Sequence, residues 1–307
     1  MRELKKIIWA TDGSKESNEA LNYARFLAQK FGSKIIGVHV IEMPEKQLYE
    51  YLDDPESEFY YRWMEKAEES YKSKLASIRD ELFNQGVSFQ GEILKGEPNK
   101  KIVEFAVSEK ADLIVMGRRG LGLIDRILIG SSTLKVLRES SVPVLAVKKR
   151  DKGDAVEIRS ILVPLDVNEK VDSALNYAMD LAERINASIS VLYVFRLYAY
   201  SYSDYETPHS VAEDLIKLSS DKLRERVEDI KLKLGIRNRE ATRLEINAEV
   251  VQGISTSVAI IDYASSKGID LIVMNTHGRK GIKRFILGSV TEKVIQESSC
   301  AVLVLKP

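Results

Sequence analysis

The chain has 307 residues, and its 46 lysines and arginines balance 46 aspartates and glutamates, so its formal net charge is zero. The length predicts two domains or one large one, and the even charge balance argues against a protein that binds nucleic acid or an anionic membrane surface. A single cysteine, Cys300, excludes an internal disulfide framework, and three scattered histidines argue against a histidine-rich metal site. The apolar runs are too short for a membrane span or a secretory signal, so we expect a cytoplasmic protein.

Short apolar runs alternate with helical patterns along the first half of the chain. Runs such as 6–10 and 113–116 are typical of buried strands, whereas apolar residues between 20 and 31 recur at helical spacing and are followed by Gly32, a helix-stop signal. In chain order we expect strands at 6–10, 35–41, 87–94, 113–116 and 144–147, with helices at 20–31, 57–84, 99–108 and 131–139 between them.

The second half of the chain repeats the first. The sequence Ala-Leu-Asn-Tyr-Ala at 20–24 recurs at 174–178, and Asp-Leu-Ile-Val-Met at 112–116 recurs at 270–274. Because the matches keep their order, we interpret the chain as one domain duplicated in tandem, with domains at 1–150 and 151–307 and a charged linker at 148–154. The second copy is expected to hold strands at 160–163, 188–194, 248–251, 271–274 and 302–305 and helices at 171–185, 210–234, 255–265 and 289–297.

Strands that alternate with helices predict an α/β fold, here two tandem open-sheet domains. Each domain should contain a parallel sheet of five strands with helices on both faces, because the strands read as continuous apolar runs. In such sheets, ligands bind outside the carboxyl ends of the strands, where the strand order reverses. Residues that directly follow a strand are therefore the candidates for function.

A carboxylate follows the first strand of each copy: Asp12 in the first and Asp166 in the second. Two interpretations stand. The carboxylate caps the next helix, which is the commoner role of an acid at this place, or it accepts hydrogen bonds from a ligand. Taken alone, the position favours the cap.

A glycine-rich loop follows the fourth strand of each copy. In the first it contains Gly117, Gly120 and, after nine residues, Gly130 and Ser131 at the start of a helix. Glycines permit positive φ and let a ligand approach the backbone, and a Gly-Ser pair at a helix N-terminus offers N–H groups and a hydroxyl to an anion. The alternative is a plain glycine turn with a serine cap. Because the spacing occurs twice, we favour phosphate binding; the loop is neither a Walker A loop nor a dinucleotide fingerprint.

With these motifs the chain resembles the universal stress protein family over both copies. The resemblance implies an ATP- or AMP-binding α/β domain with strand order 3-2-1-4-5, usually dimeric. It implies an adenine pocket formed by the aspartate and the end of the second strand, with the glycine loop and serine around ribose and phosphates. Carried onto this chain, the site residues are Ala10, Thr11, Asp12, Val40, Met116, Gly117, Gly120, Gly130, Ser131 and Ser132, and in the second copy Asp166, Val194, Asn275, Gly278, Gly288, Ser289 and Val290.

The second copy departs from this pattern. Asn275 replaces the first glycine and Val167 stands where the first copy has Gly13. Asparagine tolerates left-handed φ, so the turn is expected to survive while the side chain crowds the ribose. The following loop carries four bases and no acid, which fits either a solvated loop or the steering of an anion. For His277 in that loop we expect a loop-ordering hydrogen bond and not a catalytic base, since no Ser-His-Asp arrangement is evident.

The expected function is that of a stress-response sensor or regulator that binds ATP or AMP, with Mg²⁺ accompanying ATP and with no catalytic residues. The alternatives are a slow ATP-hydrolysing or nucleotidyl-transfer enzyme and a nucleotide-free interaction module; the fold alone does not decide between them.

We expect no nucleic-acid or membrane partner. The final strands, 144–147 and 302–305, are expected to pair the two copies edge to edge within one chain, with a homodimer of whole chains as a further arrangement. Tyrosine-rich clusters at 49–63 and 198–205 fit helix packing or a partner surface.

Overall fold

The computed structural model describes residues 3–42, 58–120, 129–150, 155–167, 172–196, 209–233, 244–276 and 287–306. It contains two compact units, which divide between Val156 and Glu157, a few residues beyond the boundary that the sequence predicts. Among the described helices, none combines the length and apolar character that a membrane crossing requires. Tyr49, Tyr51 and the tyrosines at 198–205 lie outside the described residues.

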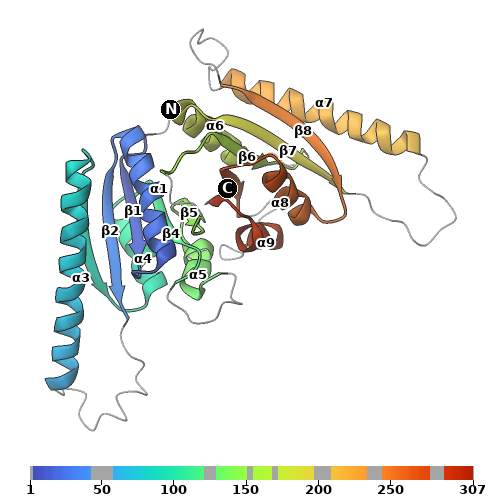
Figure 1. The fold of residues 1–307 in the computed structure, drawn as a ribbon. Coiled ribbons are helices and arrows are strands. Elements are labelled where there is room, and N and C mark those ends of the chain that lie inside the picture. The colour runs from blue at the N-terminus through green and yellow to red at the C-terminus, as the bar shows by residue number, and fades with distance from the viewer. Residues whose placement is uncertain are drawn as a thin grey trace, which may run out of the picture. The chain divides into compact units, whose positions relative to one another are not determined.

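The first unit is a parallel five-stranded sheet with helices between its strands (Figure 1). The strand order is β3-β2-β1-β4-β5, which confirms the predicted 3-2-1-4-5 topology. In chain order the elements are β1 (Lys6–Thr11), α1 (Lys15–Phe31), β2 (Lys34–Ile41), α3 (Glu58–Asn84), β3 (Phe89–Lys95), α4 (Pro98–Ser108), β4 (Leu113–Gly117), α5 (Ser131–Glu139) and β5 (Val144–Val147).

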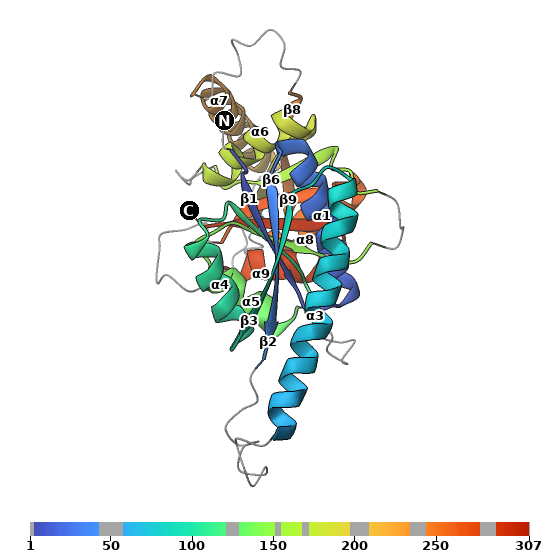
Figure 2. The ribbon, with the colours of Figure 1, turned by 90° about the vertical axis from the view of Figure 1, so that its left-hand side faces the viewer.

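The helices of the first unit cover both faces of its sheet. The chain steps from β1 to β2 to β3 in one direction and then returns through β4 to β5. Because crossovers between parallel strands are right-handed, this reversal places α1 and α3 on one face and α4 and α5 on the other, as Figure 2 shows. The reversal lies between β1 and β4, and there the loops that follow these strands diverge to opposite faces.

The core of this unit consists of strand side chains that are buried on both faces. Ile7, Ile8 and Trp9 of β1 are almost fully buried, as are Ile114 and Val115 of β4. Each such side chain stabilises the fold by about 1.5–3 kcal/mol relative to an exposed position. The indole N–H of Trp9 donates a hydrogen bond of 2.7 Å to the carbonyl at position 17, so the central strand also fixes the first turn of α1.

The second unit repeats this architecture with the strand order β8-β7-β6-β9-β10. Its first helix begins at Ser173 and not at 171, with Asp172 as the residue before the helix. In chain order the elements are β6 (Ser160–Pro164), α6 (Ser173–Ile185), β7 (Ser188–Arg196), α7 (His209–Lys233), β8 (Ile246–Gly253), α8 (Thr256–Ser266), β9 (Leu271–Asn275), α9 (Ser289–Glu297) and β10 (Ala301–Leu305).

Candidate functional site

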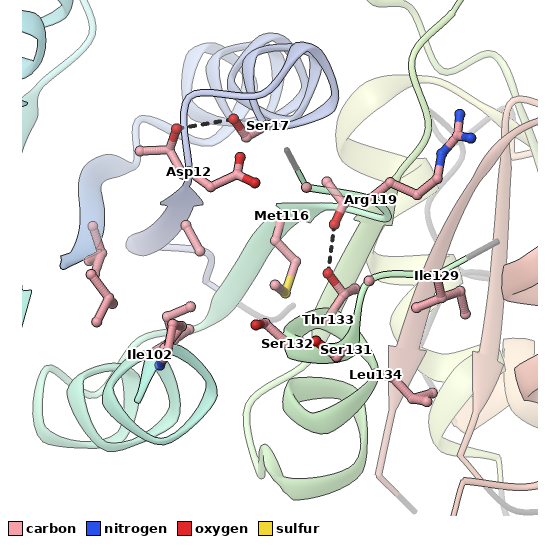
Figure 3. A pocket seen from close by; sticks show the side chains of 18 of the residues that line it. Asp12, Ser17, Ile102, Met116, Arg119, Ile129, Ser131, Ser132, Thr133 and Leu134 are labelled. Atoms are coloured by element: carbon pink, nitrogen blue, oxygen red, sulfur yellow. Dashed lines mark hydrogen bonds between the residues drawn. The ribbon is translucent and has the colours of Figure 1, made fainter. Parts of the chain in front are cut away.

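A cavity of about 760 Å³ lies at the carboxyl ends of β1, β2 and β4 in the first unit, where the strand order reverses. The starts of α4 and α5 complete its wall. All ten residues that the sequence nominates in the first copy line this cavity: Ala10, Thr11, Asp12, Val40, Met116, Gly117, Gly120, Gly130, Ser131 and Ser132. Figure 3 shows Asp12 and the two serines on different sides of the cavity, with Met116 between them.

Part of the cavity wall is apolar. Val38 and Val40 alternate along β2 and therefore face the same side of the sheet. They meet Ile102 of α4 and Met116 at the end of β4 in this lining. Sequence reasoning missed Val38 and Ile102, although the two-residue spacing of the valines and the helical position of Ile102 were available signals. This wall suits the flat apolar face of a ring.

Asp12 is not the cap of α1. The N-cap residue is Ser14, whose hydroxyl accepts the backbone N–H of Ser17 at 3.1 Å. The Oδ1 of Asp12 accepts the backbone N–H of Ser14 at 2.9 Å and so shapes the turn before the helix. The cap interpretation that the sequence favours is therefore wrong, because the serine two residues later takes that role. The Asp12 carboxylate lies instead at the wall of the cavity.

Two glycines that follow the apolar run of β4 lie close to neighbouring segments, and at Gly117 the neighbour is backbone. A Cβ at Gly117 would lie 2.9 Å from backbone atoms of Glu16 and Ser17, and a Cβ at Gly120 would collide with Oδ2 of Asp12. Neither residue has a φ in the left-handed region. The expectation that these glycines adopt a positive φ is therefore wrong, whereas the expectation that they let a ligand approach the backbone stays a prediction. The absence of a Cβ at Gly117 lets α1 pack against the end of β4, and at Gly120 it leaves space for the Asp12 carboxylate.

Gly130 begins α5 and closes the loop at its base. Its backbone φ of −67° and ψ of 145° are those of an extended N-cap residue, and its N–H donates to the Arg118 carbonyl at 2.7 Å. The buried Thr133 hydroxyl donates to the Gly117 carbonyl at 2.9 Å. Together these bonds hold the start of α5 at the cavity, where the first helical N–H groups have no partners within the helix. Such a helix end attracts anions.

A buried acid holds the middle of this loop. Glu16, in the first turn of α1, accepts the backbone N–H of Arg119 at 2.6 Å through Oε2. Its Oε1 accepts the guanidinium Nε–H of the same residue at 3.0 Å. No local pattern in the sequence predicts this pair. The internal repeat offered a signal: where the first copy has Glu16 and Arg119, the second copy has a different residue at both aligned positions, Lys170 and His277.

The turn that carries Asp12 rests on β2 and α3. The ring nitrogen Nδ1 of His39 lies 2.8 Å from the Thr11 carbonyl, and the His39 ring stacks on Tyr71 with ring centroids 3.3 Å apart. Burial lowers the pKa of His39, against the hydrogen bond to Thr11 and the charge of Asp12, which raise it. The neutral ring is thus the form that fits beneath the turn.

In the second unit the structure describes every nominated residue except Gly278, which lies outside the described residues with His277. Val194 lies in β7, and Val290 lies in the first turn of α9. Gly288 is the N-cap of α9, and its N–H donates to the Thr276 carbonyl at 2.8 Å. This bond corresponds to the one that Gly130 makes, so both units close the loop at the same place and begin the helix at a serine, here Ser289.

Two other positions of the second unit differ from expectation. Asn275 ends β9 without a left-handed φ, and its Oδ1 accepts the hydroxyl of Ser173 at 2.7 Å. Its side chain is therefore held toward α6, which corrects the expectation that it crowds a ribose. The turn after β6 also follows a different path, because Gly13 has a φ of +83° whereas Val167 has none in that region.

The turn at Asp166 is held from α7. The Nη1 of Arg226 donates to the Asp166 carbonyl at 2.8 Å, and its Nε donates to Asp172 at 2.7 Å. The Arg226 side chain is 14% exposed, so this is a largely buried contact. The second unit thus stabilises its first turn with a guanidinium, whereas the first unit uses the His39 ring.

Comparison with known proteins relates both halves of the chain to one protein family. The sequence pattern of the universal stress protein family matches residues 3–148 and again residues 157–306. A universal stress protein of Mycolicibacterium smegmatis is 24% identical over 313 residues, which cover 98% of this chain and 97% of that protein. One of Methanocaldococcus jannaschii is 34% identical over 148 residues, which cover 48% of this chain and 84% of that protein. A solved universal stress protein from Archaeoglobus fulgidus is 20% identical and shares the fold, with a TM-score of 0.70 over 99% of each chain. The chain therefore belongs to the universal stress protein family, with one family domain in each half.

Proposed function

We propose that the first domain binds an adenine nucleotide, ATP or AMP, and that the protein acts as a nucleotide-responsive sensor or regulator in the stress response. The observation that carries the proposal is the single cavity around which all ten nominated residues of the first copy meet. Its volume of about 760 Å³ lies within the range of about 300–1,000 Å³ that is usual for small-molecule sites.

The walls of the cavity supply three kinds of contact that a nucleotide needs. Val38, Val40 and Ile102 offer an apolar surface for the base. The Asp12 carboxylate also lines the cavity, where it can accept a hydrogen bond from an exocyclic amine or a ribose hydroxyl. The start of α5 offers N–H groups and the positive end of the helix dipole to a phosphate. This division of roles is the one that the family resemblance implies.

Substitution of Gly130 tests the proposal. The backbone at Gly130 is extended, and an added Cβ would lie 3.4 Å from the nearest atom, the Arg118 carbonyl oxygen, so a side chain should be accommodated by the fold. We expect Gly130→Val to weaken nucleotide binding at the first domain by more than about tenfold, because its methyl groups occupy the space in front of the helix end. Calorimetry with ATP and with AMP measures this, and mass spectrometry of nucleotide released from the denatured protein identifies the resident ligand.

Gly288→Val is the matched control, because Gly288 has the same place and backbone conformation in the second domain. If it leaves affinity and stoichiometry unchanged while Gly130→Val removes one site, only the first domain binds. If it removes a second site, both domains bind. A folded Gly130→Val chain with unchanged affinity and stoichiometry would contradict the proposal.

A further inference from the structure

A buried hydroxyl joins the start of α5 to the end of β4. Thr133, the third residue of α5, is only 4% exposed. Its hydroxyl donates a hydrogen bond of 2.9 Å to the carbonyl of Gly117, which lies 16 positions earlier in the chain (Figure 3). This is not the local bond that threonine hydroxyls often make with a carbonyl of their own helix. The bond therefore fixes the first turn of α5 relative to a strand of the sheet.

The second unit contains the same bond. Thr291 is the third residue of α9, is 4% exposed, and donates to the carbonyl of Asn275 at 3.0 Å. The residue that supplies the carbonyl differs between the units, glycine in one and asparagine in the other. Because the accepting oxygen belongs to the backbone, the bond does not depend on that side chain. A threonine bonded to the end of the fourth strand is thus a feature that both copies share.

The turn that Thr133 fixes is the part of the cavity wall that offers N–H groups. The helix begins at Gly130, which has no side-chain oxygen to cap it, and the N–H of Leu134 bonds the Gly130 carbonyl at 3.0 Å. The N–H groups of the three residues between them have no partner within the helix. Ser131, Ser132 and Thr133 all line the cavity.

The apolar wall of the cavity is built from other elements. Val38 and Val40 belong to β2, and Ile102 belongs to α4. The bond from Thr133 to Gly117 involves neither of these elements. A small displacement of the start of α5 would therefore change the geometry of its N–H groups and leave the surface that we assign to the base in place.

We infer that Thr133 is a positioning residue for the phosphate of the bound nucleotide, an inference that rests on the proposed function. The proton of its hydroxyl is committed to the Gly117 carbonyl, so Thr133 acts through the backbone of α5. It holds the N–H groups of the first turn in place against β4. Hydrogen bonds weaken steeply when their angle or length departs from the optimum, so the phosphate contacts depend on this anchor and the base contacts do not.

The contribution of the phosphate to binding tests the inference. AMP and adenosine differ only in the phosphate, so the ratio of their dissociation constants, adenosine over AMP, isolates it. Thr133→Val removes the hydroxyl and keeps the shape of the side chain, whereas Thr133→Ser keeps the hydroxyl. Both are compared with the parent by calorimetry on the full chain, in a Gly288→Val background that removes any signal from the second domain. Thr291→Val is the matched control, because it deletes the same bond in the other unit.

The expected changes fall on AMP alone. Thr133→Val should lower the ratio about tenfold through weaker AMP binding, with adenosine binding within about twofold of the parent. Thr133→Ser should retain the parent ratio, and Thr291→Val should leave both constants unchanged. Thr133→Ala gives the same prediction as the valine variant and preserves the test if that variant does not fold. A threonine that served only the stability of the domain would lower the free energy of unfolding and leave the ratio unchanged.

The contrary outcomes are distinguishable. If the folded valine and alanine variants keep the parent ratio, or if Thr133→Ser loses it as they do, Thr133 does not position the phosphate although nucleotide binding stands. If the parent binds adenosine as tightly as AMP, the phosphate site of the proposed function is absent. If the parent binds neither compound, the proposed function fails as a whole, and this inference fails with it.

Discussion

At the scale of single residues, the glycines around the cavity differ in the space that their neighbours leave for a side chain. The space beside Gly117 is already filled by the backbone of α1, whereas Gly130 has room for a side chain. A glycine motif of this kind therefore combines a position that the fold requires, Gly117, with one that our proposal assigns to the ligand, Gly130. Only the second can be removed by substitution without disturbing the packing of the domain.

Gly117→Ala should destabilise the first domain. Its Cβ would lie 2.9 Å from backbone atoms that cannot move alone, so α1 must shift, at a cost of about 1–3 kcal/mol. Gly130→Ala is the control, with an expected change within about 0.5 kcal/mol. Urea unfolding followed by tryptophan fluorescence reports the first domain specifically, since both tryptophans lie in it. Equal stability of the two variants would show that α1 does not constrain the loop.

At the scale of elements, the site depends on contacts between segments that are distant in the chain. The turn between β1 and α1 carries Asp12, yet its support comes from His39 on β2 and Tyr71 on α3. The three elements meet at these two stacked rings, and the imidazole is the ring of a type that changes its charge between pH 5 and 8. The turn that carries Asp12 is thereby supported by a ring that can take up a proton.

Acidification should weaken the first domain through His39. Burial lowers the pKa of His39 below its ordinary value of 6.5, so below that pH the unfolded chain takes up a proton that the folded domain resists. The stability from the neutral ring is complete above pH 6.5 and is lost as the pH falls toward the folded pKa. The negative charge of Asp12 raises the pKa of His39, and the positive charge of Lys74 lowers it further.

His39→Phe keeps an aromatic ring against Tyr71 and removes the titration. The difference in unfolding free energy between about pH 7.5 and about pH 5 should be smaller in this variant than in the parent. Urea unfolding at the two pH values, again followed by tryptophan fluorescence, measures it. An identical pH dependence in both chains would mean that His39 protonates equally well folded and unfolded.

The sequence predicts the order of elements because burial on both faces of a strand leaves a continuous apolar run, as at 113–116. With the family resemblance it also predicts part of the cavity lining, mostly from places after β1 and β4, but it misses Val38 and Ile102. It does not predict the Glu16–Arg119 pair, whose members are 103 positions apart and carry no local signal. Nor does it distinguish Asp12 from Ser14 as the cap, since both are good capping residues and the choice depends on tertiary neighbours.

At the scale of the whole molecule, the chain contains the family fold twice. Each unit has its own parallel sheet, and its last strand, β5 or β10, stands at one end of the strand order within that unit. Both strands are short and apolar, and an open apolar edge strand invites pairing. Our prediction that the two copies pair through these strands comes from the sequence and the family resemblance, as does the alternative of a homodimer.

Separated halves test this prediction. Chains that end at Arg150 and begin at Asp154 should each fold around their own sheet, and should associate with each other or with themselves through the final strands. Light scattering at micromolar concentration measures their masses singly and mixed. Two stable monomers that do not bind one another would contradict the arrangement.

The hydrogen bond that closes each loop after the fourth strand has an evolutionary consequence. Gly130 donates to Arg118 and Gly288 donates to Thr276, so in both units the two ends of the loop are fastened together beside the sheet. The two ends of the loop are thus held by backbone bonds that do not depend on the side chains between them. The sequences between the joined ends differ: one contains Asp125 and Arg126, and the other contains four bases, at 279, 280, 283 and 284, and no acid. Duplication of a domain whose loop is closed in this way allows the two loop sequences to diverge while the strand architecture is preserved.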